Sequence, residues 1–267
     1  MHERMERNRR MSRYFKTAML FLLVLGLWCA QAWSGNVLTQ ISTIDALLAG
    51  AYDGHVTIGE LKAFGDLGIG TFHALDGEMI ALNGRVFQAR ADGRIVAVPD
   101  SLTTPFAVMV FFEADKTLPL PSGLNLEAFT LMTDPLLPSV NLFYAFRIEG
   151  TFDTMRVRSV PGQTKPYPPL TEVVQHQYLK TLEKVEGTVV GFRCPPFVRG
   201  VNVPGYHLHF IDRDEKAGGH VLEFAVSEAV LQWDEISNFH MMLPRDPLFS
   251  RINLEKDRQE DLQKVEK

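Results

Sequence analysis

Between residues 70 and 98, apolar and polar residues alternate in short runs that end at turn dipeptides. Asn83-Gly84 and Asp92-Gly93 separate these runs, and both dipeptides favour the left-handed backbone conformations of two-residue hairpin turns. Strands joined by such turns are antiparallel neighbours. The sequence therefore predicts an antiparallel meander over residues 70–98 and constrains the chain to a β-rich fold.

The rest of the chain adds more strands and a few short helices to this meander. Apolar residues at helical spacing predict helices within three segments, and continuous or alternating apolar runs predict strands within five others. The helical segments are 44–54, 56–65 and 121–139, and the strand segments are 105–115, 141–160, 187–195, 201–212 and 218–235. The charged segment 253–267 favours a helical tail.

A proline-rich segment, GQTKPYPPL at residues 162–170, interrupts the strand pattern and predicts a boundary between two lobes. We expect an α/β fold with two β-rich lobes. The N-terminal α/β lobe, residues 33–165, would contain a mixed sheet. The C-terminal lobe, residues 166–267, would be antiparallel and barrel-like, with a metal-binding hairpin and the C-terminal tail.

Residues 1–32 have the pattern of a secretory signal peptide. A basic segment precedes an apolar run of about 14 residues, which is short for a membrane span. Small residues at Ala30 and Ala32 fit a signal-peptidase site, and Met11 is an alternative start. Trp28 before Cys29 argues against a lipid anchor. We expect an exported protein, periplasmic or extracellular, that has no membrane segment after cleavage.

Composition excludes several partners for the exported chain. The chain has 267 residues, 46% of them hydrophobic, enough for a sizeable core. Without residues 1–32 it has 21 basic and 30 acidic residues, a net charge of −9. Such an acidic chain is a poor ligand for nucleic acid or anionic membranes. Only Cys194 remains, so an intrachain disulfide is excluded and this thiol is interpreted as a buried core residue.

Three histidines near the C-terminus form the strongest chemical signal. In GYHLHFID, His207 and His209 are two residues apart, so on a strand their side chains share a face. The segment DRDEKAGG has the character of a hairpin connection. A turn centred between Asp214 and Glu215 sets His209 opposite His220, on that same face. Three converging imidazoles with open coordination positions are typical of a catalytic zinc site, although other divalent ions fit as well.

Other interpretations of the histidines are weaker. His55, His73, His176 and His240 are interpreted as solvated or core residues. The cupin pattern also contains two histidines one residue apart on a strand, but it places a glutamate four or five residues after the second one. Here Glu215 follows His209 by six residues, and His220 comes almost at once.

Several motifs together resemble the acetolactate decarboxylase family. These are DALLAGAYDG, FGDLGIGTFHALDGEMIALNG, NLFYAFRIEGTF, EGTVVGF and GYHLHFID followed by GGHV, in that order over residues 40–230. The resemblance implies a zinc enzyme that converts (S)-2-acetolactate to (R)-acetoin and CO2, in acetoin and 2,3-butanediol metabolism. It further implies a homodimer, a small-molecule substrate and no organic cofactor.

The resemblance also implies roles for individual residues. His207, His209 and His220 would hold Zn2+, and a glutamate of the C-terminal tail would complete the site. Glu266 is the best match for that glutamate, with Glu255 and Glu260 as alternatives. Glu78 of LDGE would be the catalytic acid, with Glu266 sharing proton transfer. Arg147 of FYAFRI would bind the substrate carboxylate, and Thr71 of GIGTF would line the site.

Two other functions remain open at this point. One is an exported zinc hydrolase or lyase that uses metal-bound water, which a large separation of Glu78 and Arg147 from the metal would favour. The other is a non-catalytic zinc protein, in which a fourth protein ligand closes the site and leaves no cavity.

Overall fold

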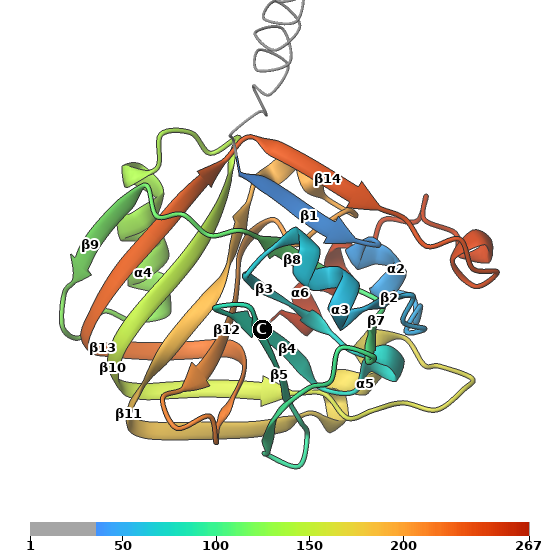
Figure 1. The fold of residues 1–267 in the computed structure, drawn as a ribbon, viewed down its shortest axis with the longest axis horizontal. Helices are drawn as coiled ribbons and strands as arrows, with labels where there is room; N and C mark the ends of the chain where they lie inside the picture. The colour runs from blue at the N-terminus through green and yellow to red at the C-terminus, as the bar shows by residue number, and fades with distance from the viewer. Residues whose placement is uncertain (1–35, 267) are drawn as a thin grey trace, which may run out of the picture. The chain divides into compact units, whose positions relative to one another are not determined.

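A seven-stranded sheet forms one layer of the protein in the computed structural model, which describes residues 36–266 (Figure 1). The predicted signal peptide, residues 1–32, lies outside the described residues. The predicted meander is confirmed, because β3, β4, β5 and β6 are successive antiparallel neighbours. The sheet is mixed, since β1 pairs with β14 in parallel. In sheet order the strands are β14 (Asn238–Met242), β1 (Val37–Ile41), β8 (Ala107–Val110), β3 (Leu67–Thr71), β4 (Glu78–Leu82), β5 (Arg85–Ala89) and β6 (Ile95–Ala97).

A second sheet contains the long strands of the molecule. Its order is β10 (Phe143–Ser159), β11 (Tyr178–Cys194), β12 (Gly205–Asp212), β13 (Gly218–Ile236) and β9 (Lys116–Leu120). β13 also pairs with β10 along most of its length, so each of the four strands β10 to β13 has two partners among the other three. The segment 141–160 is therefore one long strand with bulges rather than a hairpin.

The expected division of the chain at residue 165 does not separate the two sheets. β9 and β10 precede this position but belong to the second sheet, and β14 follows it but lies at the edge of the first. The described residues 36–266 belong to one compact unit. The proline-rich segment is therefore a connection between β10 and β11, which pair with each other. Pairings between distant strands leave no periodic signal in the sequence. The composition of the proline-rich segment therefore did not reveal that strands on either side of it belong to the same sheet.

Short helices cover the ends of the sheets. They are α2 (Ile44–Leu48), α3 (Ile58–Leu61), α4 (Leu126–Thr133), α5 (Leu170–Val173) and α6 (Gln259–Val265). Short 3-10 turns follow several of them, and β2 (Val56–Thr57) pairs with β7 (Thr103–Thr104) in a separate ribbon. No helix within residues 36–266 is long and apolar enough to span a membrane.

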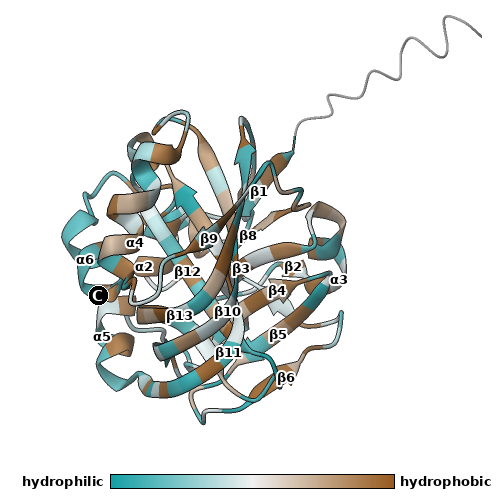
Figure 2. Ribbon diagram, turned by 90° about the vertical axis from the view of Figure 1, so that its left-hand side faces the viewer, coloured by the Kyte–Doolittle hydropathy of each residue, from teal (hydrophilic) through white to brown (hydrophobic). Residues whose placement is uncertain are grey.

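The seven-stranded sheet is buried on both faces, so a polar side chain on one of its central strands lies in one of two cores. Along β8, Val108 and Val110 pack in the core shared with the second sheet, whereas Ala107 and Met109 pack on the opposite face. Hydrophobic residues recur along the strands of both sheets (Figure 2). β4 lies against β12 and β13 in the shared core. Residues of β4 that face this core, including Glu78, are thus brought to the predicted histidine hairpin.

Candidate metal centre

β12 and β13 bring the three predicted histidines together. His209 pairs with His220 across the two strands, which confirms the register predicted from the hairpin. His207 lies two residues before His209 on the same face. The ring centroids are 5.0 to 5.4 Å apart in all three pairs. Each imidazole offers a ring nitrogen that lies within 4.8 Å of the other two.

Burial keeps these imidazoles neutral. Desolvation, with the nearby Arg158 guanidinium as a second cause, lowers the pKa of His207 to about 3. The pKa values of His209 and His220 also lie well below the usual range, chiefly because both rings are buried. A neutral imidazole has a free lone pair, the form in which histidine binds a metal.

Each ring also has a buried nitrogen without a hydrogen-bond partner among the described residues: His207 Nδ1, His209 Nε2 and His220 Nδ1. His209 Nδ1 is 2.7 Å from the Met79 carbonyl oxygen. With its proton on Nδ1 this ring donates to that oxygen and leaves Nε2 free as a ligand, an arrangement common for metal-binding histidines. Three converging neutral imidazoles, each with one ring nitrogen that has no hydrogen-bond partner among the described residues, fit a divalent cation.

A buried ion pair lies beside the histidines. Arg158 on β10 donates from Nη1 to Glu78 Oε1 at 2.9 Å, and both side chains are under 10% exposed. Glu78 Oε2 is 3.8 Å from His209 Nε2. Burial raises the pKa of Glu78 to about 7, against the opposing charge of Arg158. A pKa raised toward neutral pH suits a group that exchanges protons.

Arg158 is the functional candidate that the sequence did not single out. A regular strand would point Arg156 and Arg158 to the same side, because they are two residues apart. Both arginines lie on the face of β10 opposite Met155 and Val157, but Arg156 is exposed, whereas Arg158 is covered by Glu78 and the end of α6 and is 5% exposed. Its partner on β13 is His220, which sets the guanidinium over the histidine cluster. Strand alternation does not reveal which of the two arginines other elements cover, so the sequence did not single out Arg158.

Helix α6 brings the C-terminal glutamate to the site. Glu266 Oε2 is 3.8 Å from His220 Nε2, whereas Glu255 and Glu260 are exposed. The Val265 carbonyl oxygen accepts a hydrogen bond of 3.0 Å from Arg158 Nη2, which fixes the end of the helix to β10. Burial raises the pKa of Glu266 to about 7. Of the three glutamates considered from the sequence, the structure places Glu266 beside the imidazoles.

The structure does not bring Arg147 to the histidines. This residue is eleven positions before Arg158 on β10, roughly 36 Å along an extended strand. Its neighbours across the sheet are Val190 and Gln232. Its guanidinium donates to Asn83 Oδ1 at 3.2 Å and forms an ion pair with Glu149. The anionic partner that its apolar sequence context called for is thus a surface carboxylate, and the site arginine is Arg158.

Thr71 lies next to the site but is held by the backbone. It pairs with Glu78 across β3 and β4, and its hydroxyl donates to the Gly77 carbonyl oxygen at 2.7 Å. In this structure Thr71 therefore stabilises the turn that precedes Glu78. Cys194 is buried as predicted, and desolvation raises the pKa of its thiol to about 12, so it is not a nucleophile at neutral pH.

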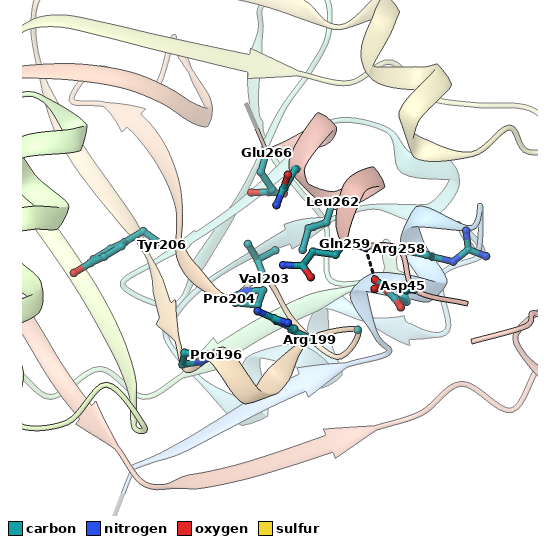
Figure 3. A pocket seen from close by; sticks show the side chains of 13 residues that line it. Asp45, Pro196, Arg199, Val203, Pro204, Tyr206, Arg258, Gln259, Leu262 and Glu266 are labelled. Carbon is teal, nitrogen blue, oxygen red and sulfur yellow. Dashed lines mark hydrogen bonds between the residues drawn. The ribbon is translucent and has the colours of Figure 1, made fainter. Parts of the chain in front are cut away.

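A pocket of about 250 Å³ has Glu266 in its lining (Figure 3). Glu266 stands at one end of it, and α6 forms one wall through Leu262 and Gln259. Another part of the lining comes from the segment before β12 and from the start of that strand, and includes Val203, Pro204 and Tyr206. A small molecule that enters this pocket meets Glu266, the residue that contacts His220.

These features place the protein among β-rich proteins with a buried three-histidine site of the kind that binds divalent metals. The sequence profile described as alpha-acetolactate decarboxylase matches residues 38–256. The chain belongs to the alpha-acetolactate decarboxylase family, which confirms the resemblance seen in its motifs.

Relatives and solved structures agree with this assignment. An alpha-acetolactate decarboxylase of Methanosarcina mazei is 48% identical over 88% of this chain and 81% of its own length. One from Methylococcus capsulatus is 47% identical over 85% of this chain and 87% of its own. The crystal structure of the Bacillus subtilis strain 168 enzyme superposes with a TM-score of 0.85 at 37% identity, over 86% of this chain and 99% of that one.

Proposed function

We propose that this protein catalyses the decarboxylation of (S)-2-acetolactate to (R)-acetoin and CO2, with Zn2+ held by His207, His209, His220 and Glu266. The observation that carries the proposal is the assembly of three neutral imidazoles, the Arg158–Glu78 pair and Glu266 around one buried point. The names of the relatives supply the substrate, and the site supplies groups suited to it.

The reaction needs two kinds of assistance. Loss of CO2 breaks the bond between the carboxylate and the hydroxyl-bearing carbon, and its electron pair stays with the substrate as an enediolate. A divalent cation held by the imidazoles supplies positive charge near the carbonyl and hydroxyl oxygens, which lowers the energy of that anion. A proton must then be added to the carbon that lost CO2.

Glu78 is suited to supply this proton. Its carboxyl group is buried within 3.8 Å of His209, and burial raises its pKa to about 7, toward the protonated form that a proton donor needs. A donor fixed on one side of a planar enediolate adds the proton to one face, which produces a single acetoin enantiomer. Glu266, with the same raised pKa, can share this proton transfer from the pocket side.

Arg158 takes the role that the sequence assigned to Arg147. Its guanidinium carries five N–H donors, and two of its nitrogens are bound to Glu78 and to the Val265 carbonyl oxygen. Nε has no partner among the described residues. The remaining donors and the fixed positive charge are available to the substrate carboxylate and to the negative charge that develops on the substrate.

The two competing functions are less well supported. A hydrolase using metal-bound water was favoured only if the acid and the cation lay far from the metal. Arg147 is distant, but Glu78 is adjacent and Arg158 replaces Arg147. A closed, non-catalytic zinc site predicts no cavity, whereas a pocket of about 250 Å³ reaches Glu266.

The test is to measure metal content and acetoin formation on one sample of the purified chain from residue 33. We expect one zinc per chain and conversion of one acetolactate enantiomer to acetoin with an equal amount of CO2. Removal of the metal with a chelator should abolish turnover, and added zinc should restore it. A sample with one zinc per chain that forms no acetoin contradicts the proposed reaction.

We propose in addition that residues 1–32 direct export, and that the mature protein is a homodimer in the periplasm or the medium. The basic and apolar segments of residues 1–32 and the acidic charge of the remainder support export. N-terminal sequencing of protein recovered outside the cytoplasm should begin at residue 33. Light scattering on a size-exclusion column should give twice the chain mass, and a monomeric mass would contradict the dimer.

A further inference from the structure

The turn that leads into Glu78 is held in a strained backbone conformation. Ala74 and Leu75 have φ values of 62° and 58°, in the left-handed region that residues with a Cβ rarely adopt. Each such residue costs on the order of 1 kcal/mol or more and persists only where the surroundings enforce it. Two such residues in succession, ending three residues before the candidate proton donor, indicate that the surrounding structure holds this turn in one conformation.

Backbone groups from distant segments hold the first half of the turn. The Ala74 N–H donates to the Tyr52 carbonyl oxygen at 2.7 Å, and the Gln163 N–H donates to the Ala74 carbonyl oxygen at 2.7 Å. Gly77, at the other end, donates to the Val160 carbonyl oxygen at 3.1 Å. Between them, two side chains contact Asp76: Arg90 Nη1 is 3.5 Å from Asp76 Oδ2, and a second side chain binds both the carboxylate and the backbone of Asp76.

That side chain is Gln88, which is 4% exposed on β5. Its Nε2 donates to the Asp76 carbonyl oxygen at 2.5 Å and to Asp76 Oδ2 at 2.9 Å. Gln88 pairs with Met79 across β4 and β5, and shares its face of the sheet with Val86, away from Glu78. It therefore lies behind the strand that carries the acid, without contact with the histidines.

The start of β4 connects this clamp to two site residues at once. Glu78 follows Asp76 by two residues and carries the carboxyl group near His209. Met79 follows next, and its carbonyl oxygen is the partner of His209 Nδ1 at 2.7 Å. A shift of the backbone at Asp76 would thus move both the proton donor and the group that orients one imidazole.

We propose that Gln88 is a positioning residue, which clamps the strained turn at Asp76 and thereby sets the positions of Glu78 and His209. The proposal rests on the proposed decarboxylase function and adds a residue outside the metal centre to its machinery. Displacement of a reacting group by about 1 Å is enough to slow an enzyme up to roughly a hundredfold.

The test is the substitution Gln88→Met, which keeps the length of the side chain and removes its donors. We expect kcat to fall about tenfold or more, with KM within about twofold, because the acid is misplaced while substrate binding is kept. Gln163→Met is the matched control, because the Gln163 side chain donates only to the Pro161 carbonyl oxygen and its backbone bond to Ala74 is unaffected. It should leave kcat unchanged.

A double-mutant cycle separates positioning from a general loss of structure. If Gln88 acts through Glu78, Gln88→Met should cause little further loss of kcat in a Glu78→Gln background. An equal loss in both backgrounds, or an unchanged kcat in the single variant, overturns the proposal. If Gln88→Met fails to fold, Gln88→Glu preserves the side-chain shape while its ionised form lacks the donors, and it should show the same coupling.

A second readout does not depend on catalysis. Because Met79 orients His209, we expect a chelator to remove zinc from Gln88→Met about tenfold faster than from the wild type. If the wild type forms no acetoin, the proposed function fails and this rate still tests the clamp. If the wild type is active but both kcat and zinc loss are unchanged by Gln88→Met, the clamp fails and the function stands.

Discussion

Arg158 and Arg147 lie on the same strand, yet their surroundings give them different chemistry. Arg158 is 5% exposed and forms a buried ion pair with Glu78 beside three imidazoles. Arg147 has a side chain that is 23% exposed and pairs with Glu149, a residue two positions away on the same strand. One strand thus contributes a site cation at one end and an ordinary surface ion pair at the other.

The comparison shows that local sequence context can mislead about burial. Arg147 stands in the apolar segment FYAFRI and was assigned to the site by the family resemblance, whereas Arg158 stands in the more polar segment MRVRS. The depth of each guanidinium depends on what the two faces of β10 pack against. At the Arg158 end these are β4, the histidine hairpin and the end of α6; at the Arg147 end, the guanidinium reaches the turn at Asn83.

The largest effect is expected from the histidines at the Arg158 end. His209→Ala removes one of three ligands, and we expect loss of bound zinc and a fall in kcat/KM of about a thousandfold or more. His240→Ala, which truncates an exposed histidine on β14, is the matched control and should retain both. Metal analysis with steady-state kinetics measures the effect. An active His209→Ala variant would show that the reaction does not require the intact histidine cluster.

Glu78→Gln should come next in size. The amide has the shape of the protonated acid but donates no acidic proton, so we expect kcat to fall by a factor on the order of a thousand. The zinc content should stay at the wild-type value, because Glu78 is assigned no ligand role. If this variant keeps the wild-type kcat, Glu78 is not the proton donor, and the role belongs to Glu266.

The direct test of the comparison is the pair Arg158→Gln and Arg147→Gln. The first removes a buried cation from the site, and we expect kcat/KM to fall about a hundredfold with zinc retained. The second removes a surface ion pair, typically worth less than about 1 kcal/mol, and should change activity by less than about twofold. Equal losses from both substitutions would mean that the two ends of β10 are functionally connected. They would contradict the assignment of Arg158, and not Arg147, to the site.

The smallest effect concerns stability at the Arg147 end and its dependence on pH. Asp234 on β13 pairs with Ala145, and burial raises its pKa to about 6 from an ordinary 3.8. Because the folded state binds this proton more tightly than the unfolded state, Asp234 lowers the free energy of unfolding as pH rises from about 4 to about 6. Below that range the penalty is absent, and above it the penalty is complete.

Asp234→Asn should remove this contribution while keeping an acceptor for the Glu113 N–H. We expect the variant to be more stable than the wild type by on the order of 1 kcal/mol above pH 6, and the difference to vanish near pH 4. Urea unfolding at several pH values measures it. A difference that is constant with pH would show that Asp234 is not the titrating group.

The sequence predicted much of the site because its signals there are local. Two histidines one residue apart and a third across a short hairpin have their geometry set by the strand repeat and the turn, and the predicted pairing of His209 with His220 is the one observed. The meander that includes Glu78 was equally local, since Asn-Gly and Asp-Gly turns define it. The family motifs supplied the order of these parts along the chain.

The parts that could not be predicted depend on contacts between distant segments. The parallel pairing of β1 with β14 joins residues about 200 positions apart, so no turn motif between the two strands indicates it in the sequence. The tail offered three glutamates with similar sequence context, and only the docking of Leu262 and Val265 of α6 in the core brings Glu266 to His220.

By itself, the sequence of this protein determined a β-rich fold, its family and a three-histidine hairpin, because strand alternation and tight turns act over a few residues. Only the tertiary structure decided which cation serves the site. A bulge between Phe152 and Thr154 sets Arg158 on the face opposite Met155 and Val157, and the packing of β10 against β4 and α6 gives it Glu78 and the Val265 carbonyl oxygen as partners. A one-residue change of register reverses the face of every later side chain, and strand periodicity alone does not reveal where a bulge occurs.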